Sequence, residues 1–134
     1  MATFTATLAE TGVPAKYNEK GVFAIVTSFT LAAAENNDIV NMCKMQAGVT
    51  VIGGTLINAA LGSNTNISVG DGGSATALLG ATATSSAAGT SLIKLKTYTA
   101  DDTIKLTVTT SGGATATGLV QLVLLCTADN VDLA

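Results

Sequence analysis

Two short acidic stretches are the residues of this sequence whose types and spacing could do chemistry. Asp101 and Asp102 are adjacent carboxylates, and GDGGS at 70–74 has the glycine and acid content of a phosphate- or calcium-binding loop. A P-loop needs Gly-Lys-Ser/Thr after its glycines, and an EF-hand loop needs further spaced acids and a late glutamate; neither pattern is present. We therefore expect a plain turn at 70–74 and a solvated loop at 101–102, with no metal at either.

The residue types that are absent exclude most enzyme classes. The sequence contains no histidine, and its six basic residues are all lysines. Histidine is the commonest general base and metal ligand, and arginine supplies bidentate clamps on phosphate and carboxylate groups. Six lysines against nine acids, a net charge of -3, leave no basic surface for nucleic acid. The sequence favours a structural or binding protein that is not an enzyme and holds no cofactor.

Cysteine usage and the chain start bear on the cellular compartment. Cys43 and Cys126 each lie in an apolar stretch, which favours two buried free thiols over a disulfide. The N-terminal stretch lacks the basic and apolar regions of a secretion leader, so the glycosylation pattern at 66–68 is expected to be a chance match. The longest apolar run, 119–126, is far shorter than the ~20 residues of a membrane span. These features predict synthesis in the cytoplasm and no membrane contact.

Apolar alternation and turn-forming residues divide the chain into short strands. We expect strands at 22–31, 39–45, 49–57, 65–69, 92–98, 104–110 and 119–126. Seven or eight short strands joined by glycine-rich turns predict an all-β fold, a β-sandwich or jelly-roll-like barrel. Residues 1–20 are expected to form an extended N-terminal arm, and 21–134 a single β domain.

Two local features refine this expectation. The Gly53-Gly54 pair inside a strand indicates a bulge or a close backbone approach. Residues 72–90 are Gly, Ala, Ser or Thr apart from two leucines, a composition typical of a flexible linker. The alternative is an ordered excursion with a helical turn at 75–79, and we favour order because leucines in a true linker would have nothing to bury against.

Half of the lysines fall within two neighbouring strands. A hairpin of 92–98 and 104–110, with Thr99 opposite Ile104, would place Lys94, Lys96 and Lys105 on one face. Lysines on outer strands discourage edge-to-edge aggregation, which is the simpler interpretation. A docking site for an acidic partner is the alternative.

Long stretches of the chain carry almost no charge. Asp71 is the only charged residue between Lys44 and Lys94, and there is none between Lys105 and Asp129. Charged residues make up 11% of the chain, against about 25% in an average soluble domain. Uncharged surface of this extent suits coverage by other subunits. We therefore expect a homo-oligomer in which residues of 45–70 and 106–128 become covered.

Several turn-and-strand patterns resemble those of small virion proteins of tailed bacteriophages. They are NNDIV at 36–40, MQAGVTV at 45–51 ahead of the Gly-Gly strand, ISVGD at 67–71, and YTADDTI at 98–104. In such proteins a polar turn leads into a strand, an Ala-Gly turn and another strand, and a late hairpin precedes an apolar last strand. The resemblance covers roughly residues 20–128.

The resemblance implies a capsid decoration (cement) protein. Such proteins are small β-rich oligomers, here expected to be a trimer, that clamp subunits of the major capsid protein and stabilise the head. It also implies synthesis in the host cytoplasm and a final location on the capsid surface of the virion. Because arginine is absent and aromatics are scarce, we expect a broad, shallow interface. A fibre or receptor-binding module and a tail-tube subunit are the alternatives.

The N-terminal arm carries most of the candidate partner contacts. The full set is Phe4, Leu8, Val13 and Tyr17 on the arm, with Lys94, Lys96 and Lys105 on the predicted hairpin. A segment that folds on docking can cover a wide surface at modest affinity per unit area. A frayed tail without a role is the alternative, since terminal segments are ordered only where something ties them down.

Overall fold

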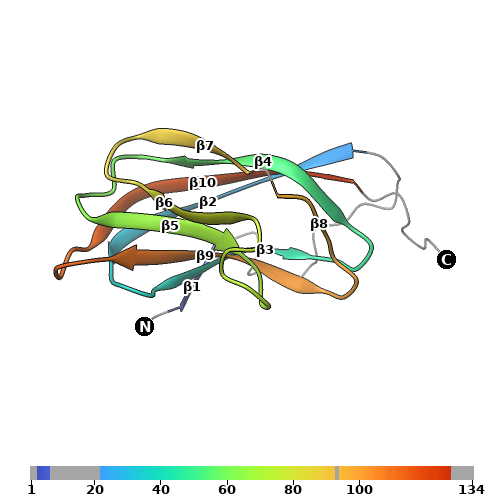
Figure 1. Ribbon diagram of the computed structural model, residues 1–134, viewed down its shortest axis with the longest axis horizontal. Coiled ribbons are helices and arrows are strands. Elements are labelled where there is room, and N and C mark those ends of the chain that lie inside the picture. The colour runs from blue at the N-terminus through green and yellow to red at the C-terminus, as the bar shows by residue number, and fades with distance from the viewer. Residues whose placement is uncertain (1–2, 7–21, 93, 128–134) are drawn as a thin grey trace.

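Two five-stranded β-sheets face each other in the computed structural model, which describes residues 3–6, 22–92 and 94–127 (Figure 1). Sheet A has the order β1 (Thr3–Thr5), β3 (Ile39–Met45), β9 (Asp102–Thr110), β5 (Thr65–Gly70) and β6 (Leu79–Ala83). Sheet B has the order β2 (Val22–Ala34), β10 (Ala116–Thr127), β4 (Thr50–Asn58) and β7 (Ala88–Leu92), and β8 (Lys96–Thr97) also pairs with β4. The described residues contain no helix, and thus none that could cross a membrane. The predicted all-β sandwich is confirmed.

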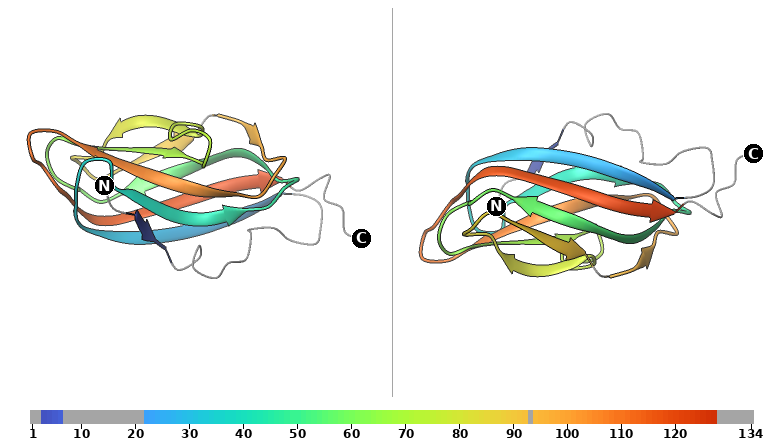
Figure 2. Two further views of the ribbon diagram at one scale, coloured as in Figure 1. Left: turned by 90° about the horizontal axis from the view of Figure 1, so that it is seen from below. Right: turned by 90° about the horizontal axis from the view of Figure 1, so that it is seen from above.

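Six of the seven predicted strands are present with small shifts at their ends, whereas the predicted strand 92–98 is wrong, because β7 ends at Leu92 and only Lys96 and Thr97 form the short β8. The stretch 39–45 is matched in full by β3, while β2 and β10 each run a few residues further than expected. Every strand pair is antiparallel except β1 with β3, which is parallel and places Phe4 beside Val40. The two layers and their long central strands are visible edge-on in Figure 2.

The predicted hairpin between 92–98 and 104–110 is wrong. Strand β9 has both edges occupied in sheet A, because Leu106 lies opposite Val40 of β3 on one side and Val69 of β5 on the other. The preceding stretch belongs to sheet B, where β8 pairs with the start of β4 and Tyr98 exchanges backbone hydrogen bonds with the chain at Gly48 and Val49. Residues 99–101 therefore cross from one sheet to the other. For 92–98 alternation also predicted the wrong buried face, because Leu92 and Tyr98 are buried while Leu95 is exposed.

The core is aliphatic and lies between the inner faces of the two sheets. Its largest fully buried side chains include Leu31, Leu56, Leu122 and Leu124 from sheet B, and Val40, Met42, Ile67, Ile104 and Leu106 from sheet A. Truncating one such side chain to alanine costs about 2–5 kcal/mol. The Thr27 hydroxyl, buried in β2, donates to the Met42 carbonyl of β3 at 2.9 Å and so links the sheets inside the core.

The Gly-Gly pair of β4 is both a bulge and a close approach, as expected. The register of β4 against β10 shifts between Leu125 and Cys126, which leaves Ile52 as the extra residue. Gly54 has a φ of 149°, and a Cβ there would run into the Val123 carbonyl of β10. Only glycine fits this backbone at this spacing.

The small-residue stretch 72–90 is ordered, which confirms the favoured interpretation. It contains β6 and β7, one at the end of each sheet. Leu78 is fully buried, and its N–H donates to the Val69 carbonyl at 3.0 Å. The expected helical turn is a simple turn instead, in which the Ala77 N–H donates to the Ser74 carbonyl. Leu78 lies in the core and Leu79 packs against it, so the two leucines hold this stretch against the sandwich.

Candidate functional site

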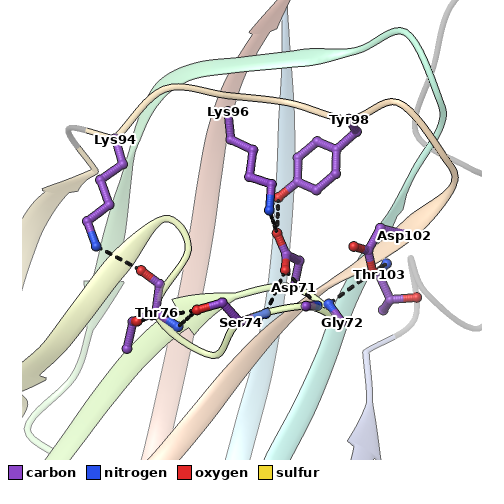
Figure 3. A network of polar contacts seen from close by, with 10 residues as sticks. Asp71, Gly72, Ser74, Thr76, Lys94, Lys96, Tyr98, Asp102 and Thr103 are labelled. Carbon is purple, nitrogen blue, oxygen red and sulfur yellow. Dashed lines mark hydrogen bonds and ion pairs between the residues drawn. The ribbon is translucent and has the colours of Figure 1, made fainter.

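The structure separates the three lysines that were expected on one face. Lys105 points outward from β9 in sheet A, whereas Lys94 and Lys96 lie in the connection between β7 and β9. Lys94 Nζ donates to the Thr76 carbonyl at 2.9 Å, and Lys96 Nζ forms an ion pair of 2.8 Å with Asp71 (Figure 3). Lys94 and Lys96 thus both contact the loop that follows β5. They do not align with Lys105, because the predicted hairpin is not formed.

Asp71 is the centre of the best-developed polar cluster in the described residues. Its side chain is fully buried, and both oxygens are in use. Oδ1 accepts the N–H groups of Gly73 at 2.9 Å and Ser74 at 3.0 Å, so the loop folds around the carboxylate. Oδ2 receives the Tyr98 hydroxyl at 3.0 Å in addition to the Lys96 ammonium. The expected turn at 70–74 is present, and its acid is a structural anchor.

The charge state of Asp71 follows from these contacts. Burial alone would raise its pKa, but the ion pair with Lys96 and three hydrogen bonds lower the pKa below its ordinary value of 3.8. The pKa of Tyr98 is raised by burial and by its hydrogen bond to Asp71, so the phenol stays protonated and donates. Lys96 also lies over the Tyr98 ring, 5.4 Å from its centre. Asp71 is therefore a carboxylate that ties the end of β5 in sheet A to β8 in sheet B.

The adjacent acids at 101 and 102 are not simply solvated, which corrects the sequence expectation. Asp101 Oδ1 accepts the Ala47 N–H at 3.0 Å, and Asp102 Oδ1 accepts the Gly72 N–H at 3.0 Å. Each acid thus fixes a different loop of the same end of the molecule. Among the residues that the structure describes, no cluster of three or more histidine, cysteine or acidic side chains could hold a metal ion.

The two cysteines are free and buried, as expected. Burial raises the pKa of both thiols to about 12, and the proximity of Cys126 adds to the shift at Cys43. A thiolate is the reactive form of cysteine, so neither side chain is set up as a nucleophile at neutral pH. They act as small apolar side chains of the core.

Only the first of the arm residues proposed as contacts falls within the described part of the chain. Phe4 is half-buried in β1, and its ring centre lies 5.8 Å from that of Phe29 in β2. The neighbouring Ala6 is buried and donates its N–H to the Asn41 carbonyl at 2.8 Å. Residues 3–6 thus pack on the domain itself, while Leu8, Val13 and Tyr17 lie outside the described residues.

The solvent-facing side of β2, β10, β4 and β7 forms one surface, which we call the neutral face. The uncharged stretches 45–70 and 106–128 include β4 and β10, but the sequence reasoning missed the contribution of β2 and β7. None of these four strands contains a charged residue. Its large exposed apolar side chains are Val22, Val26, Ile52, Ile57, Leu119 and Leu125. The signal was present in the chain, because the stretch 22–26 has apolar residues at its outward positions as well as its inward ones.

The fold defined by these two sheets is shared with chains from bacteriophage capsids. Similar structures occur in the capsid of Ralstonia phage GP4 (TM-score 0.77, 14% identity, covering 97% of this chain and 99% of that one) and in the capsid asymmetric unit of cyanophage Pam1 (0.68, 24%, 86% and 90%). A third occurs in the acid-stable capsid of Helicobacter pylori bacteriophage KHP30 (0.55, 16%, 81% and 91%). No protein-family model matches the sequence, and no curated protein matches it either.

Proposed function

We propose that this chain is a bacteriophage capsid decoration protein that binds the lattice of the major capsid protein and stabilises the head. The observation that carries the proposal is the likeness over most of each chain to proteins found in phage capsids. The alignment with the GP4 capsid chain spans nearly the full length of both molecules. The likeness therefore extends over nearly the whole of a chain that occurs in a phage capsid, which supports a role in the shell.

The proposed mechanism is non-covalent bridging between shell subunits in the virion. The buried thiols with raised pKa values and the fully paired Asp71 carboxylate offer no reactive group, which supports a structural role without enzyme activity. Modest affinity per contact is sufficient, because many copies on one shell and several contacts per oligomer multiply the effect. We propose that the chain acts as a homo-oligomer, with three copies as the expected number.

Binding to heads that lack the protein tests this proposal. Heads assembled without the chain are mixed with the purified protein, sedimented and imaged by electron microscopy. The expected result is saturable binding, added density on the outer surface of the shell, and a higher temperature of head disruption. Absence of binding at saturating protein overturns the proposal, as does density in the tube or fibres of the tail.

A further inference from the structure

The neutral face concentrates the exposed apolar surface of the described residues on one side of the sandwich. Seven large apolar side chains of the described residues are exposed, and six of them lie on the neutral face. The seventh is Leu95. Val22 and Val26 on β2 are 63% and 62% exposed, and their neighbours across the sheet are uncharged. Apolar patches of this extent usually mark an interaction site.

The extent of the face matches the requirement of a stable protein interface. Strand β10 has 12 residues, and β2 has 13. Strands β4 and β7 add 9 and 5 residues, so at ~3.4 Å per residue and ~4.8 Å per strand the four strands present roughly 600–700 Å². A specific interface buries about 800 Å² per partner, so the sheet with its flanking loops provides a surface of that class.

Charge distribution indicates a second copy of this chain as the occupant. Like charges that face each other across a contact oppose self-association. The four strands of the neutral face contain no charged residue, whereas the outer side of sheet A carries Lys44 and Lys105. A charged surface gives selectivity toward a different protein of complementary charge. Charge repulsion therefore opposes self-association least when the contact is made through the neutral face.

We propose that the neutral face is the surface through which copies of this chain associate. The inference deepens the proposed function and rests on it for its setting: association through sheet B leaves the outer side of sheet A free for the shell. The contact is expected to be insensitive to salt, because it opposes no charged groups across the interface.

One substitution placed on each sheet tests the assignment. Ala24 on β2 and Ala83 on β6 are both exposed strand residues, Ala24 on the neutral face and Ala83 on sheet A. Ala24→Glu puts an unpaired carboxylate into the proposed contact, and we expect it to raise the Kd of self-association about 100-fold. Ala83→Glu is the matched control and should change that Kd less than about twofold. Sedimentation equilibrium on the purified full chain gives both values, and circular dichroism checks folding.

A second variant keeps the test decisive if Ala24→Glu does not fold. Ser28→Lys introduces the opposite charge at an exposed and already polar position of β2, and the same loss of association is expected. The inference is overturned if the wild-type chain stays monomeric at about 100 μM, or if both neutral-face variants associate as the wild type does. It is also overturned if they lose only head binding, because the shell would then be the occupant.

Head binding of the wild type is measured separately from its self-association. A chain that associates through the neutral face but does not bind heads contradicts the proposed function and leaves this inference standing. A chain that binds heads while Ala24→Glu associates normally contradicts the inference and leaves the function standing.

Discussion

Replacing Asp71 by alanine removes a carboxylate that accepts hydrogen bonds from four donor groups. The Tyr98 hydroxyl is buried and loses its partner, and the two backbone N–H groups that Oδ1 accepts lose theirs. An unsatisfied buried donor costs about 1–3 kcal/mol. The Lys96 ammonium contributes less, because its side chain is 37% exposed and water replaces the lost carboxylate. We expect Asp71→Ala to lower the free energy of unfolding by about 3–4 kcal/mol, within the range for breaking a buried pair.

The assay is urea unfolding at pH 7, with thermal unfolding as a second measurement. For a domain of this size the expected loss corresponds to a Tm lower by about 10 °C or more. Asp101→Ala is the matched control, since that exposed carboxylate accepts a single N–H, from Ala47; it should cost less than about 1 kcal/mol. If the two variants lose the same small amount of stability, the interpretation of Asp71 as the link between the sheets is refuted.

The pH dependence gives an independent check on the same residue. The pKa of Asp71 is lower in the folded chain than its ordinary value of 3.8, so the ionised group stabilises the fold. This contribution is fully present above the unfolded pKa and is lost as the pH falls through the folded pKa. The stability difference between wild type and Asp71→Ala should thus be constant above about pH 5 and shrink below about pH 4. A difference that grows on acidification would contradict the sign of the pKa shift.

Four further perturbations have defined outcomes. Gly54→Ala should lower stability by more than about 3 kcal/mol or prevent folding, because its Cβ meets the β10 backbone, and near-wild-type unfolding would disprove the close approach. Tyr98→Phe should cost about 1–2 kcal/mol in urea unfolding, and no measurable loss would mean that water satisfies Asp71 equally well. Cys43 and Cys126 should resist a thiol reagent at pH 8 until the chain unfolds, whereas rapid labelling of the native protein would show that one is accessible. Deleting residues 2–20 should reduce occupancy on heads while the domain still folds; unchanged occupancy and heat protection would exclude the arm from docking.

The sequence predicted the strands because most of them bury one face. Period-two alternation marks a half-buried strand wherever it occurs, and β2, β3 and β9 follow it closely. Pairing was harder to predict, since the partner of a strand depends on contacts far away in the chain. The stretch 92–98 alternates as β9 does, yet it belongs to the other sheet. Strands β6 and β7 were missed because a run of Ala, Gly, Ser and Thr has no hydrophobic period.

The candidate site was predictable residue by residue but not as an arrangement. The turn at 70–74 followed from its glycines and its acid, and the buried thiols from their apolar surroundings. The contacts of Asp71 could not be foreseen, because Lys96 and Tyr98 reach it from sheet B, where their segment pairs with the start of β4. The sequence analysis paired that segment with the wrong strand. It therefore predicted that the lysines lie on a solvent-exposed face, and it gave Asp71 no side-chain partner.

The two sheets differ in a way that bears directly on how a small capsid subunit would work. Strands β2, β10, β4 and β7 of sheet B present uncharged side chains to solvent, whereas Lys44 and Lys105 lie on the outer side of sheet A. The Asp71 network joins the sheets at one end, and the Thr27 bond joins them inside the core. On the proposed function, copies associate through the neutral sheet and bind the shell through the charged one, so each copy passes force between neighbouring shell subunits.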